Sequence, residues 1–268
     1  MPNPLRLLRL IVLVSAFAGM AAAGVFPQTA SSMEARSEGK KVTGLVQAAI
    51  SGDLKLVERY LDRGTPVDVR NKAGETALMW ACRGGNAEMV GLLLKRGADV
   101  NAGTKTGWTS LMMTYQYQPD RSDIADMLIR HGANVNMKEK QFGSTPLIAA
   151  LTRGDIKSAR HLLSRGADVN VSTHVGITPL MMACAAGDEG IVRELVEKGA
   201  DINARANTGA DALMAAAARG SIPIVAYLLD KGAPINGRAY NGWTALTSAL
   251  FQDQHEMVEF LRKRGGTD

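Results

Sequence analysis

The sequence predicts an all-α protein, a solenoid in which about seven helix-turn-helix units stack on one another. Two series of glycines support this prediction. The first recurs at intervals of 33 to 35 residues, at Gly64, Gly97, Gly132, Gly166, Gly199, Gly232 and Gly265. The second keeps step with it, at Gly74, Gly107, Gly143, Gly176, Gly209 and Gly242. A fixed period of this length is typical of a stacked array, and two series in phase make coincidence implausible.

Residues 1–23 have the pattern of a secretory signal peptide. Arg6 and Arg9 precede the apolar run "LIVLVSAFAGMAAAG", whose alanines are the small residues that a signal peptidase accepts. An uncleaved membrane anchor is the alternative, but the run is shorter than the roughly 20 residues that a spanning helix needs. The arginines are not adjacent and no cysteine follows, so the sequence contains no twin-arginine or lipoprotein signal. We expect ordinary export, a mature start near Gly24 and no membrane span after cleavage.

Residues 24–41 include the polar stretch "PQTASSMEARSEGKK", which predicts a flexible leader. The repeat domain then occupies residues 42–268, and we expect one continuous curved solenoid without a second domain. The formal net charge is only +5, and many bases lie near helix ends, where they complement the helix dipole. The charge therefore gives no indication of nucleic-acid binding.

The clearest unit runs from residue 176 to residue 203 and predicts two antiparallel helices. Thr178 is suited to cap the first helix, and Pro179 fits the first helical position because its missing N–H group costs nothing there. Gly187 can adopt the left-handed conformation that ends this helix, and Asp188 can cap the next one.

The second helix of the same unit carries an apolar stripe. A buried helical face is predicted by the spacing of Ile191, Val192, Leu195 and Val196, and Gly199 closes the helix. The segment "GADIN", which recurs as "GADVN", "GANVN" and "GAPIN", then turns the chain toward the next unit. We expect its polar side chains to bond to turn amides and its aliphatic residue to point inward.

With these motifs, the sequence resembles the ankyrin-repeat family from about Val42 to Asp268. The resemblance implies helix pairs, each followed by a β-turn finger. The family's "TPLH" histidine is absent, and its position holds Met79, Met112, Ile148, Met181, Met214 and Thr247. We therefore expect a local hydrogen-bonding device to be lost. Arg262 replaces an apolar residue in the last unit, as suits a terminal repeat with no following neighbour.

Nothing in the sequence has the pattern of a catalytic, cofactor or metal site. The chain contains no HExxH pair, no Gly-x-Ser-x-Gly elbow, no phosphate-binding loop and no cysteine pair at metal spacing. Cys82 and Cys184 follow large apolar residues, and we expect both to be small buried hydrophobes. His131 and His161 are expected to be ordinary surface residues, whereas His174 lies in a predicted finger.

The resemblance implies that a protein partner binds the concave side, formed by fingers and by exposed first-helix positions. The finger candidates are Trp108, Phe142, Ser144, His174, Ile177, Tyr240 and Trp243. The first-helix candidates are Arg83, Tyr117, Arg153, Arg219 and Phe251. Aromatic residues and arginines are common interface anchors. Trp108 and Trp243 could equally cover a neighbouring repeat, and Trp80 occupies a position that is usually core.

One unit is irregular, because "GWTSLMMTYQYQPDRSDIADMLIRHGANVN" spans a glycine interval of 35 instead of 33. The two extra residues fall within "YQPDRSD", and Pro119 is suited to end the first helix. Trp108, Tyr115, Tyr117 and Phe142 gather here. One hypothesis is that they form the main partner-anchoring patch; the rival is that they fill space opened by the insertion. The position of Tyr115 holds small or apolar residues elsewhere, which favours core.

These observations favour a non-enzymatic, monomeric binding module that is exported, bacterial and periplasmic, and that scaffolds or inhibits a protein partner. The alternative is a secreted effector that acts on a host protein. An enzyme would need a polar constellation that the sequence does not reveal.

Overall fold

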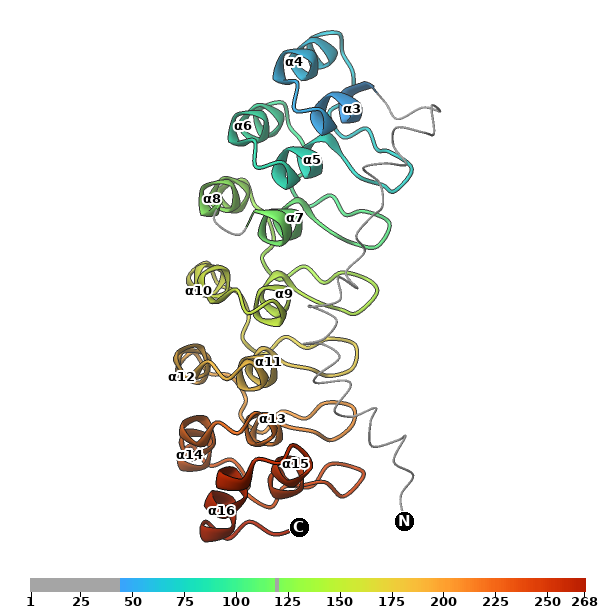
Figure 1. The fold of residues 1–268 in the computed structure, drawn as a ribbon. Coiled ribbons are helices and arrows are strands. Elements are labelled where there is room, and N and C mark those ends of the chain that lie inside the picture. Colours follow the sequence, from blue (N-terminus) through green and yellow to red (C-terminus); the bar gives the residue numbers. More distant parts are fainter. Residues whose placement is uncertain (1–43, 119–120) are drawn as a thin grey trace. The chain divides into compact units, whose positions relative to one another are not determined.

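A computed structural model describes residues 44–118 and 121–268 (Figure 1). The predicted signal peptide, its cleavage point and the polar leader lie outside these residues, as does Pro119. Contacts divide the described chain into two compact units. The N-terminal unit comprises residues 44–150 with 157–167, apart from the two residues not described, and the C-terminal unit comprises residues 151–156 with 168–268. A single continuous solenoid stays a prediction.

Fourteen helices and no strand occur in the described residues, so the predicted all-α class is confirmed. In the N-terminal unit the helix pairs are α3 (Gly44–Ile50) with α4 (Leu54–Asp62), α5 (Ala77–Arg83) with α6 (Ala87–Lys95), and α7 (Ser110–Tyr117) with α8 (Ser122–Arg130). The pair α9 (Pro146–Thr152) and α10 (Ile156–Ser164) has residues in both units.

In the C-terminal unit the pairs are α11 (Pro179–Ala186) with α12 (Glu189–Glu197), α13 (Ala212–Arg219) with α14 (Ile222–Asp230), and α15 (Ala245–Phe251) with α16 (His255–Lys263). Within each unit the second helices form an outer layer, the first helices a middle layer, and the fingers project on the other side (Figure 1).

Local capping chemistry sets the helix boundaries as predicted. The Thr178 hydroxyl accepts a hydrogen bond from the Met181 amide at 3.3 Å and begins α11. Gly187 ends that helix at φ 81°, in the left-handed region that favours glycine. The Asp188 carboxylate accepts from the Ile191 amide at 3.0 Å and begins α12.

The position that holds histidine in the family keeps a capping bond in two repeats. The Met79 sulfur lies 3.5 Å from the Thr76 backbone nitrogen, which donates to it. The Thr247 hydroxyl accepts from the Thr244 backbone amide at 2.7 Å. The expected loss of this device is therefore wrong at these two positions, because a thioether or a hydroxyl takes over as the acceptor.

In most repeats, the asparagine that ends the "GADVN"-type segment joins the chain to the following repeat. Asn101 accepts from the Asn134 amide at 2.8 Å and donates to the Gly132 carbonyl at 2.9 Å. In the C-terminal unit, Asn170 bonds in the same way to Asp201 and Gly199. The predicted bond inside the turn is also present, from the Asn101 amide to the Asp99 carboxylate. The repeated asparagine thus satisfies backbone groups of the following repeat.

The core runs between the two helix layers of each unit and includes both cysteines. Cys82 and Cys184 are fully buried and free, which confirms the sequence prediction. Burial raises the pKa of the Cys82 thiol to about 12, and burial together with the nearby Asp211 carboxylate also raises the pKa of Cys184. Arg262 is exposed on the last repeat, as expected. None of the described helices is long and apolar enough to cross a membrane.

Candidate partner-binding surface

The fingers and first helices of the N-terminal unit bring together aromatic and basic side chains. The Arg83 guanidinium lies 4.7 Å from the centre of the Trp80 ring and 4.3 Å from the centre of the Tyr117 ring. Arg83 ends α5 and Tyr117 ends α7, so this stack joins two successive repeats. Each contact is of cation–π type and contributes about 0.5–1 kcal/mol at exposed sites.

Trp80 is half-buried, so the expectation that it is core is wrong. Its indole Nε1–H group donates to the Glu75 carboxylate at 3.2 Å. Arg83 covers the indole ring. The Trp80 indole N–H group therefore has a hydrogen-bond acceptor, and a guanidinium stacks on the ring. Both contacts form at the edge of the first helix, outside the core.

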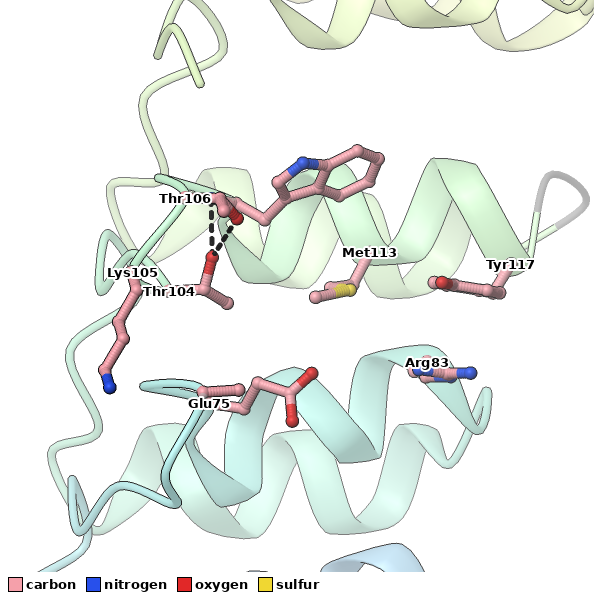
Figure 2. A pocket seen from close by; sticks show the side chains of 9 residues that line it. Glu75, Arg83, Thr104, Lys105, Thr106, Met113 and Tyr117 are labelled. Atoms are coloured by element: carbon pink, nitrogen blue, oxygen red, sulfur yellow. Dashed lines mark hydrogen bonds between the residues drawn. The ribbon is translucent and has the colours of Figure 1, made fainter. Parts of the chain in front are cut away.

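Between these repeats lies a groove with a volume of about 210 Å³. Its lining residues are Ala73, Glu75, Arg83, Thr104, Lys105, Thr106, Trp108, Met113 and Tyr117. Figure 2 shows Glu75 and Met113 directed into the space between the two repeats, with Arg83 and Tyr117 facing each other at one end. Lys105 lies at the other end (Figure 2). The groove therefore lies where the family resemblance places partner contacts.

Backbone contacts fix the fingers that border the groove. The Lys105 amide donates to the Ala73 carbonyl at 3.0 Å, and Arg70 donates to the Gly103 carbonyl at 2.6 Å. Gly74 has φ 83°, and a β-carbon there would lie 3.0 Å from the Lys105 nitrogen. Only glycine allows this close approach without strain. The walls of the groove are thus held by bonds between adjacent repeats.

The inserted segment also reaches back to the preceding repeat. The helix α7 ends at Tyr117, close to the predicted position, and the Gln118 amide group donates to the Arg83 carbonyl at 3.1 Å. Arg121 donates to the Gly85 carbonyl at 2.5 Å. Both bonds satisfy backbone groups at the end of α5, where the helix leaves carbonyls without intrahelical partners.

Phe142 is half-buried on a finger that a buried glutamate organises. Both oxygens of Glu139 accept backbone amides, from Gln141 at 2.7 Å and from Phe142 at 2.6 Å. The Ser144 amide donates to the same carboxylate at 3.0 Å. Ser144 is buried, with 7% of its surface exposed, so its place among the finger candidates is corrected because its amide turns inward to Glu139.

In the C-terminal unit, His174, Arg153 and Arg219 are exposed, but Ile177 is not. Only 8% of the Ile177 surface is accessible, so its prediction as a partner contact is wrong. Its amide donates to the Thr173 hydroxyl at 3.0 Å, and its carbonyl accepts from the Thr173 amide. This pairing closes the finger and turns the isoleucine side chain into the core.

The last repeat carries the most exposed aromatic side chain of the predicted set. Tyr240 has 78% of its surface exposed at its finger. Trp243 is half-buried and packs against Phe251, with ring centres 5.3 Å apart. Phe251 and Leu250 are each 41% exposed at the end of α15. We name the four residues Tyr240, Trp243, Leu250 and Phe251 the terminal aromatic patch.

Sequence comparison assigns the repeats to a known family. A family model described as "Ankyrin repeats (3 copies)" matches residues 45–139, 118–206 and 204–268. The chain belongs to the ankyrin-repeat family. Ankyrin repeats are protein–protein interaction modules, and the family is generally non-enzymatic.

The ankyrin fold also matches a solved structure. The chain is similar to the crystal structure of the ankyrin repeat domain of Bcl-3, described as a unique member of the IkappaB protein family, with 25% sequence identity. The TM-score is 0.69, and the match covers 82% of this chain and 98% of the Bcl-3 chain. No curated protein matches the chain.

Beside helices α8 and α10, the N-terminal ankyrin unit contains a partly buried polar cluster that the sequence did not predict. The Tyr115 hydroxyl lies 2.8 Å from His161 Nδ1, and His161 Nε2 lies 2.8 Å from an Asp126 carboxylate oxygen. Arg165 donates to the other oxygen of Asp126 at 2.8 Å. Tyr115 is buried, which confirms its assignment to the core.

His161 is therefore not an ordinary surface residue, and only 17% of its side chain is exposed. The reason is Tyr115, which fills a position held by Cys82, Leu151, Cys184 and Ala217 in other repeats. A buried tyrosine hydroxyl needs a partner, and the histidine of the following second helix provides one. Within residues 44–118 and 121–268, no three His, Cys, Asp or Glu side chains are grouped so as to hold a metal ion.

Proposed function

We propose that this ankyrin-repeat protein is an exported, non-enzymatic module that scaffolds or inhibits a protein partner. The partner contacts the fingers and the exposed ends of the first helices. The observation that carries the proposal is the accessibility of the terminal aromatic patch together with exposed Arg153, His174 and Arg219. Aromatic residues and arginines dominate the binding energy of protein interfaces.

Tyr240 supports this proposal most directly. Its ring is 78% exposed, and an isolated exposed aromatic is unremarkable by itself. Here it lies on the same repeat as a half-buried tryptophan and two further exposed apolar side chains. Such a group matches the composition of an interface centre, which is rich in tyrosine, tryptophan and phenylalanine and poor in lysine and glutamate.

Export to the periplasm is the second part of the proposal, and it rests on Arg6, Arg9 and the apolar run that follows them. A secreted effector acting on a host protein is the alternative. Mass spectrometry of the native protein tests export, with an expected start near Gly24. An intact Met1 terminus on a cytosolic species would contradict export, and accumulation in the medium would favour the effector.

Partner binding is tested by capture from an envelope fraction with the tagged mature chain. We expect retention of a defined protein that is lost when Tyr240 and Arg219 are both replaced by alanine. The matched control replaces Lys198 and Glu256, which are exposed at second-helix ends. The proposed surface would be contradicted if the control variant lost the captured protein equally, or if the Tyr240 and Arg219 variant still retained it.

A further inference from the structure

The groove of the N-terminal unit contains a buried carboxylate with an unused oxygen. Glu75 has only 4% of its surface exposed. Both of its side-chain bonds go to Oε2, from Asn71 at 2.6 Å and from the Trp80 indole at 3.2 Å. No group in the described part of the chain bonds to Oε1, and Glu75 lines the groove. Figure 2 shows its carboxylate directed into the space between the two repeats.

The other buried glutamate of this unit provides a direct contrast. Glu139 is likewise 4% exposed, but three backbone amides donate to its two oxygens. Full amide ligation stabilises a buried carboxylate without a counter-ion. In Glu75 only Oε2 accepts hydrogen bonds, from the neutral Asn71 amide group and from the Trp80 indole. Oε1 of Glu75 is therefore a strong hydrogen-bond acceptor that is available to a ligand in the groove.

The basic residues that line the groove do not neutralise Glu75. No ion pair joins Glu75 to any basic side chain of residues 44–118 or 121–268. Arg83 stacks between Trp80 and Tyr117, which fixes its guanidinium at the end of the groove. Figure 2 shows the Lys105 ammonium directed away from the carboxylate. A buried carboxylate is most stable with a cationic partner, and the part of the chain that the structure describes supplies none.

The remaining walls suit the stem of a long basic side chain. Trp108, Met113 and Tyr117 present apolar surface beside Glu75. Lysine and arginine characteristically place their methylene groups against such surface while their charged ends reach a polar partner. The volume of about 210 Å³ corresponds to several water molecules at roughly 30 Å³ each. It therefore accommodates one side chain.

We infer that this groove receives an arginine or lysine side chain of the partner protein, with its cationic end on Glu75 and its stem against Trp108 and Met113. The inference rests on the proposed function and adds the chemistry of one anchor. An acidic side chain would meet Glu75 with like charge, and a purely apolar one would leave Oε1 of Glu75 without a hydrogen-bond partner.

Nuclear magnetic resonance with small probes tests the inference on the mature chain. The probes are N-acetyl-arginine methylamide, its neutral citrulline isostere and N-acetyl-glutamate methylamide. We expect the arginine probe to shift the Trp108 indole and Met113 methyl resonances saturably, with a millimolar Kd. Citrulline should bind about tenfold more weakly, because a charge-assisted bond is lost. The glutamate probe should cause no saturable shift at these two residues.

The Glu75→Gln variant should weaken arginine binding by about tenfold. It retains a carbonyl oxygen for Asn71 and Trp80, and its melting curve reports whether the fold survives. The citrulline comparison needs no variant, so it decides the matter even if Glu75→Gln misfolds. Equal binding of arginine and citrulline, or no saturable shift with arginine, overturns the inference.

The outcomes separate this inference from the proposed function. A chain that captures its partner through the terminal aromatic patch but ignores the arginine probe retains the proposed function and loses the groove anchor. Saturable arginine binding without capture of any protein supports the groove and contradicts the wider proposal.

Discussion

The groove of the N-terminal unit and the terminal aromatic patch use aromatic residues in opposite ways. At the end of the groove, Tyr117 and the neighbouring Trp80 are half-buried, and both stack on the lining residue Arg83. In the patch, Tyr240 is 78% exposed, and Trp243 contacts an aromatic ring of its own repeat. The first arrangement joins two repeats, whereas the second leaves aromatic surface available. Exposure and intramolecular partners therefore distinguish an aromatic that supports the stack from one that is suited to bind.

The largest expected effect is at Tyr115, the most deeply buried aromatic residue of the irregular repeat. Tyr115→Ala should reduce the free energy of unfolding by roughly 3–4 kcal/mol, as large-to-small core substitutions do. It also leaves the buried side of His161 without its hydroxyl partner. Urea denaturation followed by circular dichroism measures the change.

Tyr115→Phe is the matched control, because it removes the hydroxyl alone. We expect it to cost about 1–2 kcal/mol through the unpaired imidazole nitrogen. A Tyr115→Ala chain that stays within about 1 kcal/mol of the parent would contradict a packing role for this tyrosine.

Tyr240 should show the reverse behaviour. Tyr240→Ala should weaken partner binding by about 2 kcal/mol, the scale of an interface anchor. The free energy of unfolding should change by less than about 0.5 kcal/mol, because the ring is exposed. Titration calorimetry with the captured partner and urea denaturation together test this split. Lost stability with unaltered affinity would show that the patch covers the last repeat instead of binding.

Tyr117 distinguishes the two hypotheses about the irregular repeat. Tyr117→Ala removes one ring from Arg83, and we expect a stability loss of about 1 kcal/mol with a smaller change in affinity. If Tyr117 anchors the partner, the substitution should instead weaken binding by about 2 kcal/mol with little change in melting temperature. Phe142→Ala serves as the comparison, since Phe142 is also half-buried but its finger is held by Glu139.

The features that could be predicted from the sequence depend on neighbouring residues. Thr178, Gly187 and Asp188 determine helix ends through bonds spanning three or four positions, so their roles follow from residue type alone. The terminal exposure of Arg262 follows from the repeat count. These features place the helices and assign the fold class.

The features that could not be predicted depend on distances across the stack. Tyr115 and His161 are 46 positions apart, and their bond exists because a large residue fills a small position of the repeat. The burial of Ile177 was also not predicted, although the bond to Thr173 that closes its finger spans only four positions. The substitution of tyrosine at the Tyr115 position was visible in the sequence. The identity of its partner required the packing geometry.

The smallest expected effect concerns the ion pair beside the inserted segment, which the regular turn at Gly187 and Asp188 lacks. Arg121 donates to both oxygens of Asp123, at 2.9 and 2.8 Å, and also to the Gly85 carbonyl. The hydrogen bond from Arg121 lowers the pKa of the Asp123 carboxyl. Its stabilisation is therefore present above the unfolded pKa of about 3.9 and is lost as the pH falls through the lower folded value.

Asp123→Asn should accordingly reduce the free energy of unfolding at pH 7 by about 0.5 kcal/mol, because both side chains are partly exposed and surface pairs contribute little. The difference from the parent should shrink as the pH falls below about 4 and vanish below the lowered folded pKa, where the parent carboxylate is also neutral. Urea denaturation at pH 7 and pH 3 measures both values. A difference that persists unchanged at pH 3 would show that Asp123 acts through its hydrogen-bonding shape instead of its charge. The inserted segment would then be held by hydrogen bonds that do not need the charge of Asp123, as the fingers beside the groove are held by backbone hydrogen bonds.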